Sequence, residues 1–464
     1  MMRSPSMTVL GLVGACLTAF AVGCGGAPGG ATGGEMGSSA ATGSNDTSTG
    51  AVWTTHYTSP NGVVTEVEGA SIDAAGDVHT LVRYDSPDLG HNELAKLDSH
   101  GAVQWRTVMK LDGGGTDELV RLSVTPDGQI AAGGTWYSAD RRTSAMIVYR
   151  LDAAGNVLAR WQGDTTSSFY DVRLCSDGNA VVAGAANGQA RVVALGANGS
   201  VAWNATYAVP GSTSTTAIHV RCAHEGGVIV AGTSFVSSVP ALTLFSFDGA
   251  GTLRWTYAAP AGIGAPQGLA LDGSDAAYAV TTRQSDAGSE LAIVAVDSLG
   301  RSLWTYTSGG TTDAGASLAV DANGNVTAVG ARTTNGAEHA LSVALDPRGN
   351  VRWTHDEPFT SGKSSAAKAC SLDDVGHALV AATVGTDAGL LFYDATGTEL
   401  WRQELASTTP LWAAVANGMG YVVGGSSTGL VVSAFASNDD SITRDVTPPE
   451  ARVRFPGKNA TGAR

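Results

Sequence analysis

One short pattern recurs along this chain of 464 residues and constrains its fold more than any other feature. The pattern is an Asp, a Gly three residues later and a Trp four residues after the Gly. Two further copies are degenerate. In one, Gly196 stands in place of the Asp, before Gly199 and Trp203. In the other, Asp152 and Gly155 are present but Trp161 comes six residues after the Gly in place of four. The glycines of successive copies are 44 to 54 residues apart, and a period near fifty residues is typical of a propeller. Complete copies lie at Asp98/Gly101/Trp105, Asp248/Gly251/Trp255, Asp297/Gly300/Trp304, Asp346/Gly349/Trp353 and Asp394/Gly397/Trp401.

Each period subdivides in the same way. Residues 315–356 contain short apolar runs at 317–321, 326–330 and 340–346, followed by a run that includes Trp353. Asn, Asp and Gly separate these runs, and this spacing is typical of strands joined by tight hairpin turns. Four antiparallel strands in one period of about fifty residues predict one propeller blade.

The count of strands predicts how the ring closes. Sets of three strands begin near residues 69, 119, 170, 218, 268, 317, 369 and 412, and each is expected to receive a fourth strand that carries a Trp. The last set has no Trp strand after it, whereas the first Trp strand, residues 51–58, has no set before it. We therefore predict an all-β, eight-bladed β-propeller of four-stranded antiparallel blades over residues 51–438. Its N-terminal strand closes the last blade, which leaves no open edge between blades.

The three residues of the pattern have different expected roles. The Gly allows a backbone with φ > 0 in the tight turn before the fourth strand, and the Asp side chain can bond to the turn backbone. The Trp is large enough to fill the space between neighbouring blades, so Trp304→Ala is predicted to cost about 3–5 kcal/mol. We assign this blade-docking role to Trp53, Trp105, Trp203, Trp255, Trp304, Trp353 and Trp401.

These residues also carry a resemblance to known families. The stretch "YDATGTELW" (393–401) resembles the tryptophan-docking motif of quinoprotein-type (PQQ-like) propeller repeats. The stretches "AVDANGNVTAVG" (319–330) and "ALDPRGNVRW" (344–353) are similar to SBBP-type propeller repeats of bacterial surface proteins. The resemblance covers residues 51–438 and implies a propeller of the WD40 or YVTN-like kind, a fold that hosts many functions. Quinoprotein dehydrogenases carry an adjacent Cys pair that this chain lacks, so no quinone cofactor is expected.

The N-terminus predicts export and a lipid anchor. An apolar run at residues 9–22 is short for a membrane span and fits a secretory signal. It ends in Ala-Val-Gly-Cys24, which resembles a bacterial lipobox, so we predict a signal peptide over 1–23 and lipid attachment at Cys24. Cys16 after Val-Gly-Ala (13–15) is a second match, and an ordinary signal peptide is the other alternative. Residues 24–50 are rich in Gly, Ser, Ala and Thr and predict a flexible tether. In the lipoprotein families, Gly25 in place of Asp after the Cys favours the outer membrane.

Composition excludes one class of partner. The formal net charge is −15 and no stripe of Lys and Arg occurs, so nucleic acid is not an expected partner. Cys175 and Cys222 stand at matching points of consecutive repeats, and an exported chain permits their pairing, although the residues alone leave it open. Residues 439–464 are predicted to form a tail, which from residue 446 onwards is basic and contains Pro. We interpret it either as a disordered end or as a docking peptide for a partner.

Motifs that could carry chemistry have structural interpretations. The stretch GSSTG (425–429) matches G-x-S-x-G, but a nucleophile elbow needs a strand-to-helix turn and these residues join two strands. The stretch DANGN (321–325) is similar to a calcium loop but lacks further acidic ligands, which favours a hairpin turn. His219 and His224 stand five residues apart on a strand and a turn, where they can lie near each other, and a solvated or hydrogen-bonding role is expected. We predict no catalytic residue, cofactor or metal site.

The sequence therefore indicates a non-catalytic binding or scaffolding platform in the bacterial envelope. Its plan of lipid anchor, tether and propeller is similar to that of the eight-bladed lipoprotein of the outer-membrane β-barrel assembly machinery. The expected partner is another envelope protein, and the membrane is contacted through the lipid alone. The alternative is a ligand-binding or enzymatic propeller whose site lies in the central funnel. Ionisable side chains that converge at one mouth would favour this alternative, whereas a broad patch on a face or rim would favour the platform.

Overall fold

The computed structural model describes residues 51–57, 63–85, 91–109, 115–359, 363–426 and 429–436. The chain divides into two compact units, Met1–Ala40 and Ala41–Arg464, and all described residues belong to the second. The predicted signal peptide, Cys24, the tether and the tail lie outside the described residues. Within the described ranges, no helix has the length and apolar character needed to span a membrane.

Every element of the described chain is a β-strand, and the strands form eight four-stranded sheets. Blade 1 contains β2 (Val63–Ile72), β3 (Val78–Asp85), β4 (His91–Leu97) and β5 (Val103–Met109). Blade 2 contains β6 (Gly115–Val124), β7 (Ile130–Ser138), β8 (Ser144–Leu151) and β9 (Val157–Gln162). Blade 3 contains β10 (Ser167–Leu174), β11 (Ala180–Ala186), β12 (Gln189–Leu195) and β13 (Val201–Tyr207). Blade 4 contains β14 (Ser214–Cys222), β15 (Val228–Val236), β16 (Val239–Phe247) and β17 (Leu253–Ala258).

The second half of the ring repeats this plan. Blade 5 contains β18 (Ile263–Leu271), β19 (Ala277–Ser285), β20 (Gly288–Val296) and β21 (Ser302–Thr307). Blade 6 contains β22 (Asp313–Val320), β23 (Val326–Thr334), β24 (Ala337–Leu345) and β25 (Val351–Glu357). Blade 7 contains β26 (Ser365–Leu372), β27 (Ala378–Val384), β28 (Asp387–Tyr393) and β29 (Glu399–Leu405). Blade 8 contains β30 (Thr408–Ala416), β31 (Met419–Ser426), β32 (Gly429–Ala436) and β1 (Trp53–Tyr57).

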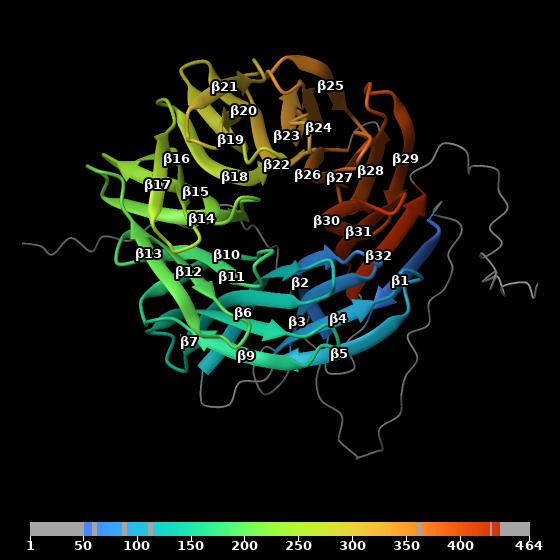
Figure 1. Ribbon diagram of the computed structural model, residues 1–464. Helices are drawn as coiled ribbons and strands as arrows, with labels where there is room; N and C mark the ends of the chain where they lie inside the picture. Colours follow the sequence, from blue (N-terminus) through green and yellow to red (C-terminus); the bar gives the residue numbers. More distant parts are fainter. Residues whose placement is uncertain are drawn as a thin grey trace, which may run out of the picture. The chain divides into compact units, whose positions relative to one another are not determined.

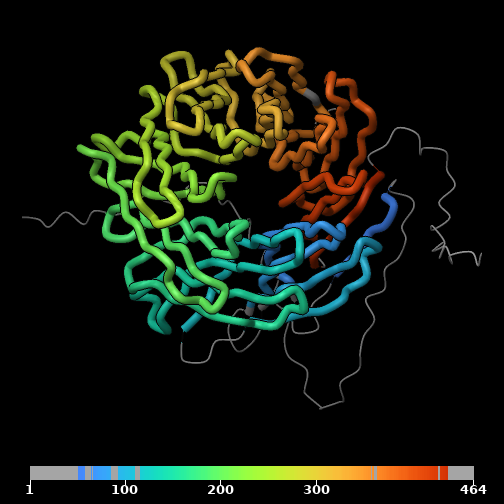
Figure 2. The backbone as a smooth tube through the Cα atoms, in the orientation of Figure 1, coloured from blue at the N-terminus to red at the C-terminus, as the bar shows by residue number. Residues whose placement is uncertain are grey.

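The eight sheets are arranged in a ring, with the first strand of each set at the centre (Figure 1). The tube view follows the chain around this ring once, from β2 to β32 (Figure 2). β1 completes the last sheet by pairing antiparallel with β32, in a register that runs from Trp53 opposite Ala434 to Tyr57 opposite Leu430. The prediction of an eight-bladed propeller closed by its N-terminal strand is confirmed.

The apolar core lies between neighbouring blades. The second and third strands of each blade are buried over most of their length, because another blade covers each of their faces. At the junction of blades 5 and 6, for example, Val280, Leu291 and Ile293 pack with Leu318 and Val343. Strands buried on both faces tolerate near-continuous apolar sequences. This explains why the sequence shows short apolar runs in place of a strict alternation.

One turn geometry recurs at two places in the blades: between the first and second strands, and between the third and fourth strands. Antiparallel strands place both of these turns at the same end of a blade, which we call the turn face. In ten of the turns, Oδ1 of the leading Asp accepts the backbone N–H groups two and four residues ahead. The leading residues are Asp73, Asp98, Asp152, Asp248, Asp272, Asp297, Asp321, Asp346, Asp373 and Asp394.

Candidate functional site

The tryptophans of the repeats lie against the next blade. Six of them contact the Gly of the turn before that blade's outer strand; the pairs are Trp53/Gly101, Trp105/Gly155, Trp203/Gly251, Trp255/Gly300, Trp304/Gly349 and Trp353/Gly397. Gly349 has φ +82°, and a Cβ placed on it would lie 2.7 Å from Cδ2 of Trp304, so both backbone conformation and space require glycine. Trp304 Nε1 also donates to the Pro347 carbonyl at 3.0 Å.

Two tryptophans depart from this arrangement. Gly199 contacts Ala159 in place of Trp161, because Trp161 stands two residues late in its strand. Trp401 stacks between Phe392 and Phe435, with ring centroids 5.4 Å from each. The reason is topological, since blade 8 draws its outer strand from the N-terminus and β32 has no turn that leads into it.

Burial reduces the expected effect of Trp304→Ala. Trp304 is half-buried, not fully covered by its neighbours as the sequence-based estimate assumed. We now expect the substitution to lower the free energy of unfolding by about 2–3 kcal/mol, which urea denaturation measures. Thr305→Ala, on the exposed neighbouring residue, is the matched control and should change stability by less than about 0.5 kcal/mol. An equal effect of the two variants would contradict the docking role.

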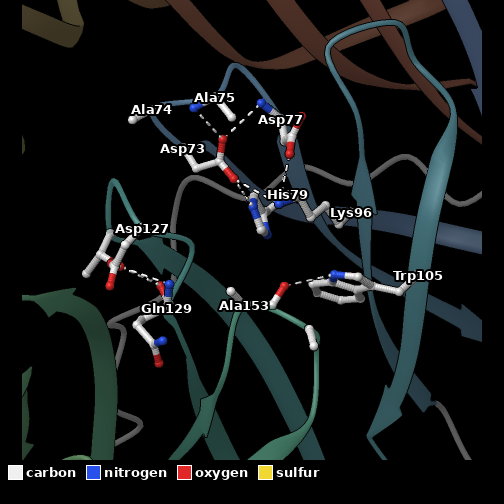
Figure 3. Close-up of polar contacts among 12 residues, drawn as sticks. Asp73, Ala74, Ala75, Asp77, His79, Lys96, Trp105, Asp127, Gln129 and Ala153 are labelled. Carbon is white, nitrogen blue, oxygen red and sulfur yellow. Dashed lines mark hydrogen bonds and ion pairs between the residues drawn. The ribbon is translucent and has the colours of Figure 1, made fainter.

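The turn face also carries a buried ion cluster at blade 1 (Figure 3). Asp73 Oδ2 lies 3.1 Å from His79 Nε2 and 3.1 Å from Lys96 Nζ, and Lys96 lies 2.8 Å from Asp77. Burial lowers the pKa of His79, although Asp73 acts in the opposite direction. The His79 ring is fully buried and packs edge-to-face on Trp105 with centroids 5.9 Å apart. A ring without solvent contact cannot reach a substrate, so this cluster has a structural role.

The innermost strands place a second group of residues, polar and apolar, at the axis of the ring. Each innermost strand has a β-bulge at the same point, and bulges re-aim side chains. The extra residue of every bulge is half-buried or exposed, so solvent reaches it. In blade order these residues are Glu68, Val120, Tyr170, Ile218, Gln267, Ala316, Lys368 and Leu411.

Asp171 is the buried centre of the axial residues in blades 3 and 4. It is 1 % exposed and follows the bulge of β10. Its Oδ2 accepts hydrogen bonds from the Val220 backbone N–H and from Arg221 Nη1, both at 3.1 Å and both from β14 of the next blade. Arg173 Nε lies 3.8 Å from the same oxygen. Burial acts to raise the pKa of Asp171, but the charges of Arg173 and Arg221 outweigh it and lower the pKa to about 2.

His219 occupies on β14 the position that Asp171 occupies on β10, directly after the bulge. Burial lowers the pKa of His219 to about 3, although the negative charge of Asp171 opposes this shift. The imidazole is therefore neutral at neutral pH. His224 pairs elsewhere, with Nδ1 2.8 Å from Oδ1 of Asp275. His224 therefore hydrogen-bonds to Asp275, whereas His219 interacts electrostatically with Asp171.

The lowered pKa of His219 predicts a dependence of stability on pH. Below pH 6.5 the unfolded chain binds a proton at this residue while the folded chain does not, so the stability associated with His219 is lost as the pH falls towards about 3. His219→Asn should remove this loss, which we expect to be about 1 kcal/mol per pH unit for a partly exposed ring. Urea denaturation at several pH values between 7 and 4 measures it. His100→Asn, at an exposed turn residue, should leave the wild-type slope unchanged.

Blades 1 and 2 continue the axial group. Arg121 follows the bulge of β6, is exposed, and donates from Nη1 to the Val120 carbonyl at 2.9 Å. Burial raises the pKa of Glu68 to about 7, although the charge of Arg121 acts to lower it. Glu68 also pairs with Arg83 at 3.5 Å. Sequence reasoning missed this group. Its signal is the tripeptide Val-Arg-Leu or Val-Arg-Cys, which recurs in three consecutive repeats at 120–122, 172–174 and 220–222.

The outer strands carry a different feature, an apolar rim. Exposed aliphatic side chains occur in or directly after the turn that leads into the outer strand, on five consecutive blades. Their exposed fractions range from 42 % to 59 %. Single exposed apolar residues are common, but a repeated row of them is typical of an interaction surface. The rim consists of Val157 and Leu158 in blade 2, Val201 in blade 3, Leu253 in blade 4, Leu299 and Leu303 in blade 5 and Val351 in blade 6.

The motifs considered for chemistry lie on strands and turns. GSSTG (425–429) lies where β31 is followed by β32, with residues 427–428 outside the described ranges. Asp321 Oδ1 accepts turn N–H groups from residues 323 and 325, which is the hairpin-turn geometry. Among the described residues, no group of three or more His, Cys, Asp or Glu side chains is placed to hold a metal ion.

Cys175 and Cys222 form a disulfide, with Cα atoms 5.4 Å apart. The bond joins the residue after β10 to the last residue of β14, and thus blade 3 to blade 4. A small, shallow hollow lies beside it, lined in part by Trp203. Cys370 is a free thiol, and burial raises its pKa to about 12.

Comparison with known proteins finds no matching family model and no matching curated protein. Two structures of Sqt1 from Chaetomium thermophilum are similar, with TM-scores of 0.54 and 0.55 at 14 % and 13 % identity; each match covers 84 % of this chain and 98 % or 99 % of the other. The propeller domain of Cps50 (Swd1) from Myceliophthora thermophila has a TM-score of 0.44 at 10 % identity, covering 82 % of this chain and 99 % of that domain. The Sqt1 similarity supports the propeller fold alone. The PQQ-like and SBBP-type families remain resemblances.

Proposed function

We propose that this protein is a bacterial envelope lipoprotein, anchored through Cys24, whose propeller binds another envelope protein without catalysing a reaction. The apolar rim is the observation that carries the binding role. It places aliphatic side chains near the start of the outer strand on five neighbouring blades, where one partner could cover several of them. Burial of apolar area at about 25 cal/mol per Å² makes such a row favourable to cover.

Export is supported by the disulfide between Cys175 and Cys222. Disulfides form and persist in oxidising compartments and are rare in the cytoplasm. This agrees with the apolar run and lipobox-like sequence before Cys24. Outer-membrane attachment is the location that Gly25 favours, and the acyl chains are then the contact with the membrane.

The binding role is tested by crosslinking a tagged protein in its own cells, followed by purification and mass spectrometry. We expect one reproducible envelope protein with the wild type, and its loss when Leu253→Glu and Leu303→Glu place two charges on the rim. Val375→Glu is the matched control, because Val375 is 67 % exposed on a turn of blade 7, away from the rim. Recovery of the same partner with the rim variant would refute the rim as the binding surface.

The anchor is tested by cell fractionation. Cys24→Ala should move the protein from the membrane fraction to the soluble fraction and abolish incorporation of a radiolabelled fatty acid. Cys16→Ala, which alters the second lipobox-like site, should change neither. The reverse pattern would place the anchor at Cys16, and a soluble wild-type protein would exclude an anchor.

A ligand site at the axis of the ring is the second candidate function. The axial group favours it, since ionisable side chains from four blades meet where propellers place ligands in their central funnel. This candidate is independent of the rim and of the anchor, and the residues at the axis define the chemistry that it would require.

A further inference from the structure

Three arginines from three consecutive blades come together at the axis of the ring. Arg173 and Arg221 stand at the same position of β10 and β14, two residues after Asp171 and His219, and Arg121 follows the bulge of β6. All three lie within electrostatic range of Asp171. Solvent reaches them, since Arg121 is exposed and the side chains of Arg173 and Arg221 are 33 % and 26 % exposed.

Their charges exceed those of the acidic groups nearby. Glu66 and Glu68 share Arg83, and Glu118 pairs with Arg141 at 3.1 Å, so these three carboxylates are paired with two arginines outside the axial three. Burial also raises the pKa of Glu68 to about 7, which leaves it only partly ionised at neutral pH. The three axial arginines, Arg121, Arg173 and Arg221, therefore face Asp171 together with the partly ionised Glu68, whose pKa the charge of Arg121 acts to lower.

Asp171 satisfies only some of these donors. Its Oδ1 accepts the Val172 N–H at 3.0 Å, and its Oδ2 accepts the Val220 N–H and Arg221 Nη1. Arg173 Nε is buried and has no hydrogen-bond partner among the described residues. A buried donor without a partner costs about 1–3 kcal/mol unless an acceptor reaches it. Beside Asp171, Arg173 Nε therefore still needs an acceptor, and a negatively charged one would suit it best.

We infer that Arg121, Arg173 and Arg221 form a binding site for a phosphate-type oxyanion at the axis of the propeller. Guanidinium groups match the oxygens of phosphate and sulfate by paired N–H donors, and partial exclusion of water strengthens these charge-assisted bonds. The anion supplies the acceptors that Asp171 lacks and balances the excess charge. This site goes beyond the proposed role of the rim and does not depend on it.

A protein with a formal charge of −15 repels anions in general, so binding at this site must come from local geometry and not from the net field. Because the net charge repels anions, binding of phosphate to this protein would be specific and not the result of a general electrostatic attraction. Chloride has no oxygens that could pair with guanidinium N–H donors, so we expect that it does not replace phosphate at this site.

The test is isothermal titration calorimetry of inorganic phosphate into the full-length protein in mild detergent, with ionic strength held constant by chloride. We expect saturable binding at one site per chain. Arg173→Gln should weaken it at least about tenfold, because it removes the donor that lacks a partner. Arg254→Gln is the matched control: it removes an equal charge from an exposed residue of β17 and should leave the affinity unchanged.

A second variant tests the sign of the effect. Asp171→Asn removes the competing negative charge, so the folded variant should bind phosphate more tightly than the wild type. If this variant does not fold, Arg173→Gln and Arg254→Gln still decide the question. Absence of saturable phosphate binding by the wild type, or equal affinity of the wild type and Arg173→Gln, overturns the proposal.

Glycerol 3-phosphate, titrated in the same way, identifies the source of the oxyanion. Affinity no greater than that for inorganic phosphate supports a free ion as the ligand. Tighter binding supports a phosphate group carried by a larger organic molecule. In both cases Arg173→Gln must abolish or weaken the binding, and rim variants must not, so failure of this site and failure of the rim are told apart.

Discussion

Deletion of residues 51–57 is expected to lower the free energy of unfolding by at least about 5 kcal/mol. These residues form β1, which supplies the outer strand of blade 8 and joins the two ends of the ring. The deletion removes Trp53, 5 % exposed, and Tyr57, 1 % exposed, and losing each such side chain costs about 3–5 kcal/mol. It also leaves β32 as an unpaired edge, which promotes association between chains. Urea denaturation and light scattering measure the two effects.

The control is a deletion of equal length, residues 41–47, from the predicted tether. It should leave the urea midpoint unchanged, because the blades then keep all of their strands. A synthetic peptide of residues 49–58, added to the protein that lacks 51–57, should restore part of the lost stability by pairing with β32. Equal stability of the two deletion variants would show that closure by β1 contributes nothing to the fold.

The fold was predictable because its determinants are local. Each blade is one period of sequence, and the turn before its outer strand needs only Asp at the first position, to accept turn N–H groups, and Gly at the fourth, where φ is positive. Asp346 and Gly349 are an example that can be recognised without any other part of the chain. The last set of three strands has no Trp strand after it, so residues 51–58 had to supply the outer strand of the last blade. Two tryptophans do not contact a turn Gly of the next blade. Trp161 stands two residues further along its strand, and blade 8, which follows Trp401, has no turn from its third strand into its outer strand.

The axial site was not predictable in the same way. Arg121, Arg173 and Arg221 are separated in sequence by 52 and 48 residues and meet only because three innermost strands lie side by side. Their repeated tripeptide was visible, but a repeated Arg on a strand is equally typical of a solvated face. Arg121 also stands two positions closer to the bulge of its strand than the other two arginines do. How far along its strand each arginine lies relative to the others therefore depends on the register, and the register is known only from the structure.

The disulfide gives the second large effect. Replacing Cys175 and Cys222 together by Ser is expected to lower the free energy of unfolding by about 3–4 kcal/mol. The reason lies mainly in the unfolded chain, where the bond closes a loop across a sequence separation of 47 residues and so reduces conformational entropy. The bond also fixes blade 3 to blade 4 beside the axial arginines, so its loss should weaken any binding there. Urea denaturation with and without dithiothreitol measures the stability.

The reductant distinguishes the effect of losing the disulfide bond on stability from the effect of replacing the two side chains. Dithiothreitol should destabilise the wild type by nearly the full difference and should leave the Cys175→Ser/Cys222→Ser variant unchanged. Cys370 does not interfere, because it is buried and burial raises the pKa of its thiol to about 12, so the reactive thiolate is scarce. A wild type whose urea midpoint is insensitive to dithiothreitol would mean that the bond adds no stability. A sensitive one ties the full stability of the propeller to an oxidising compartment, which is the location that export through the N-terminal signal would provide.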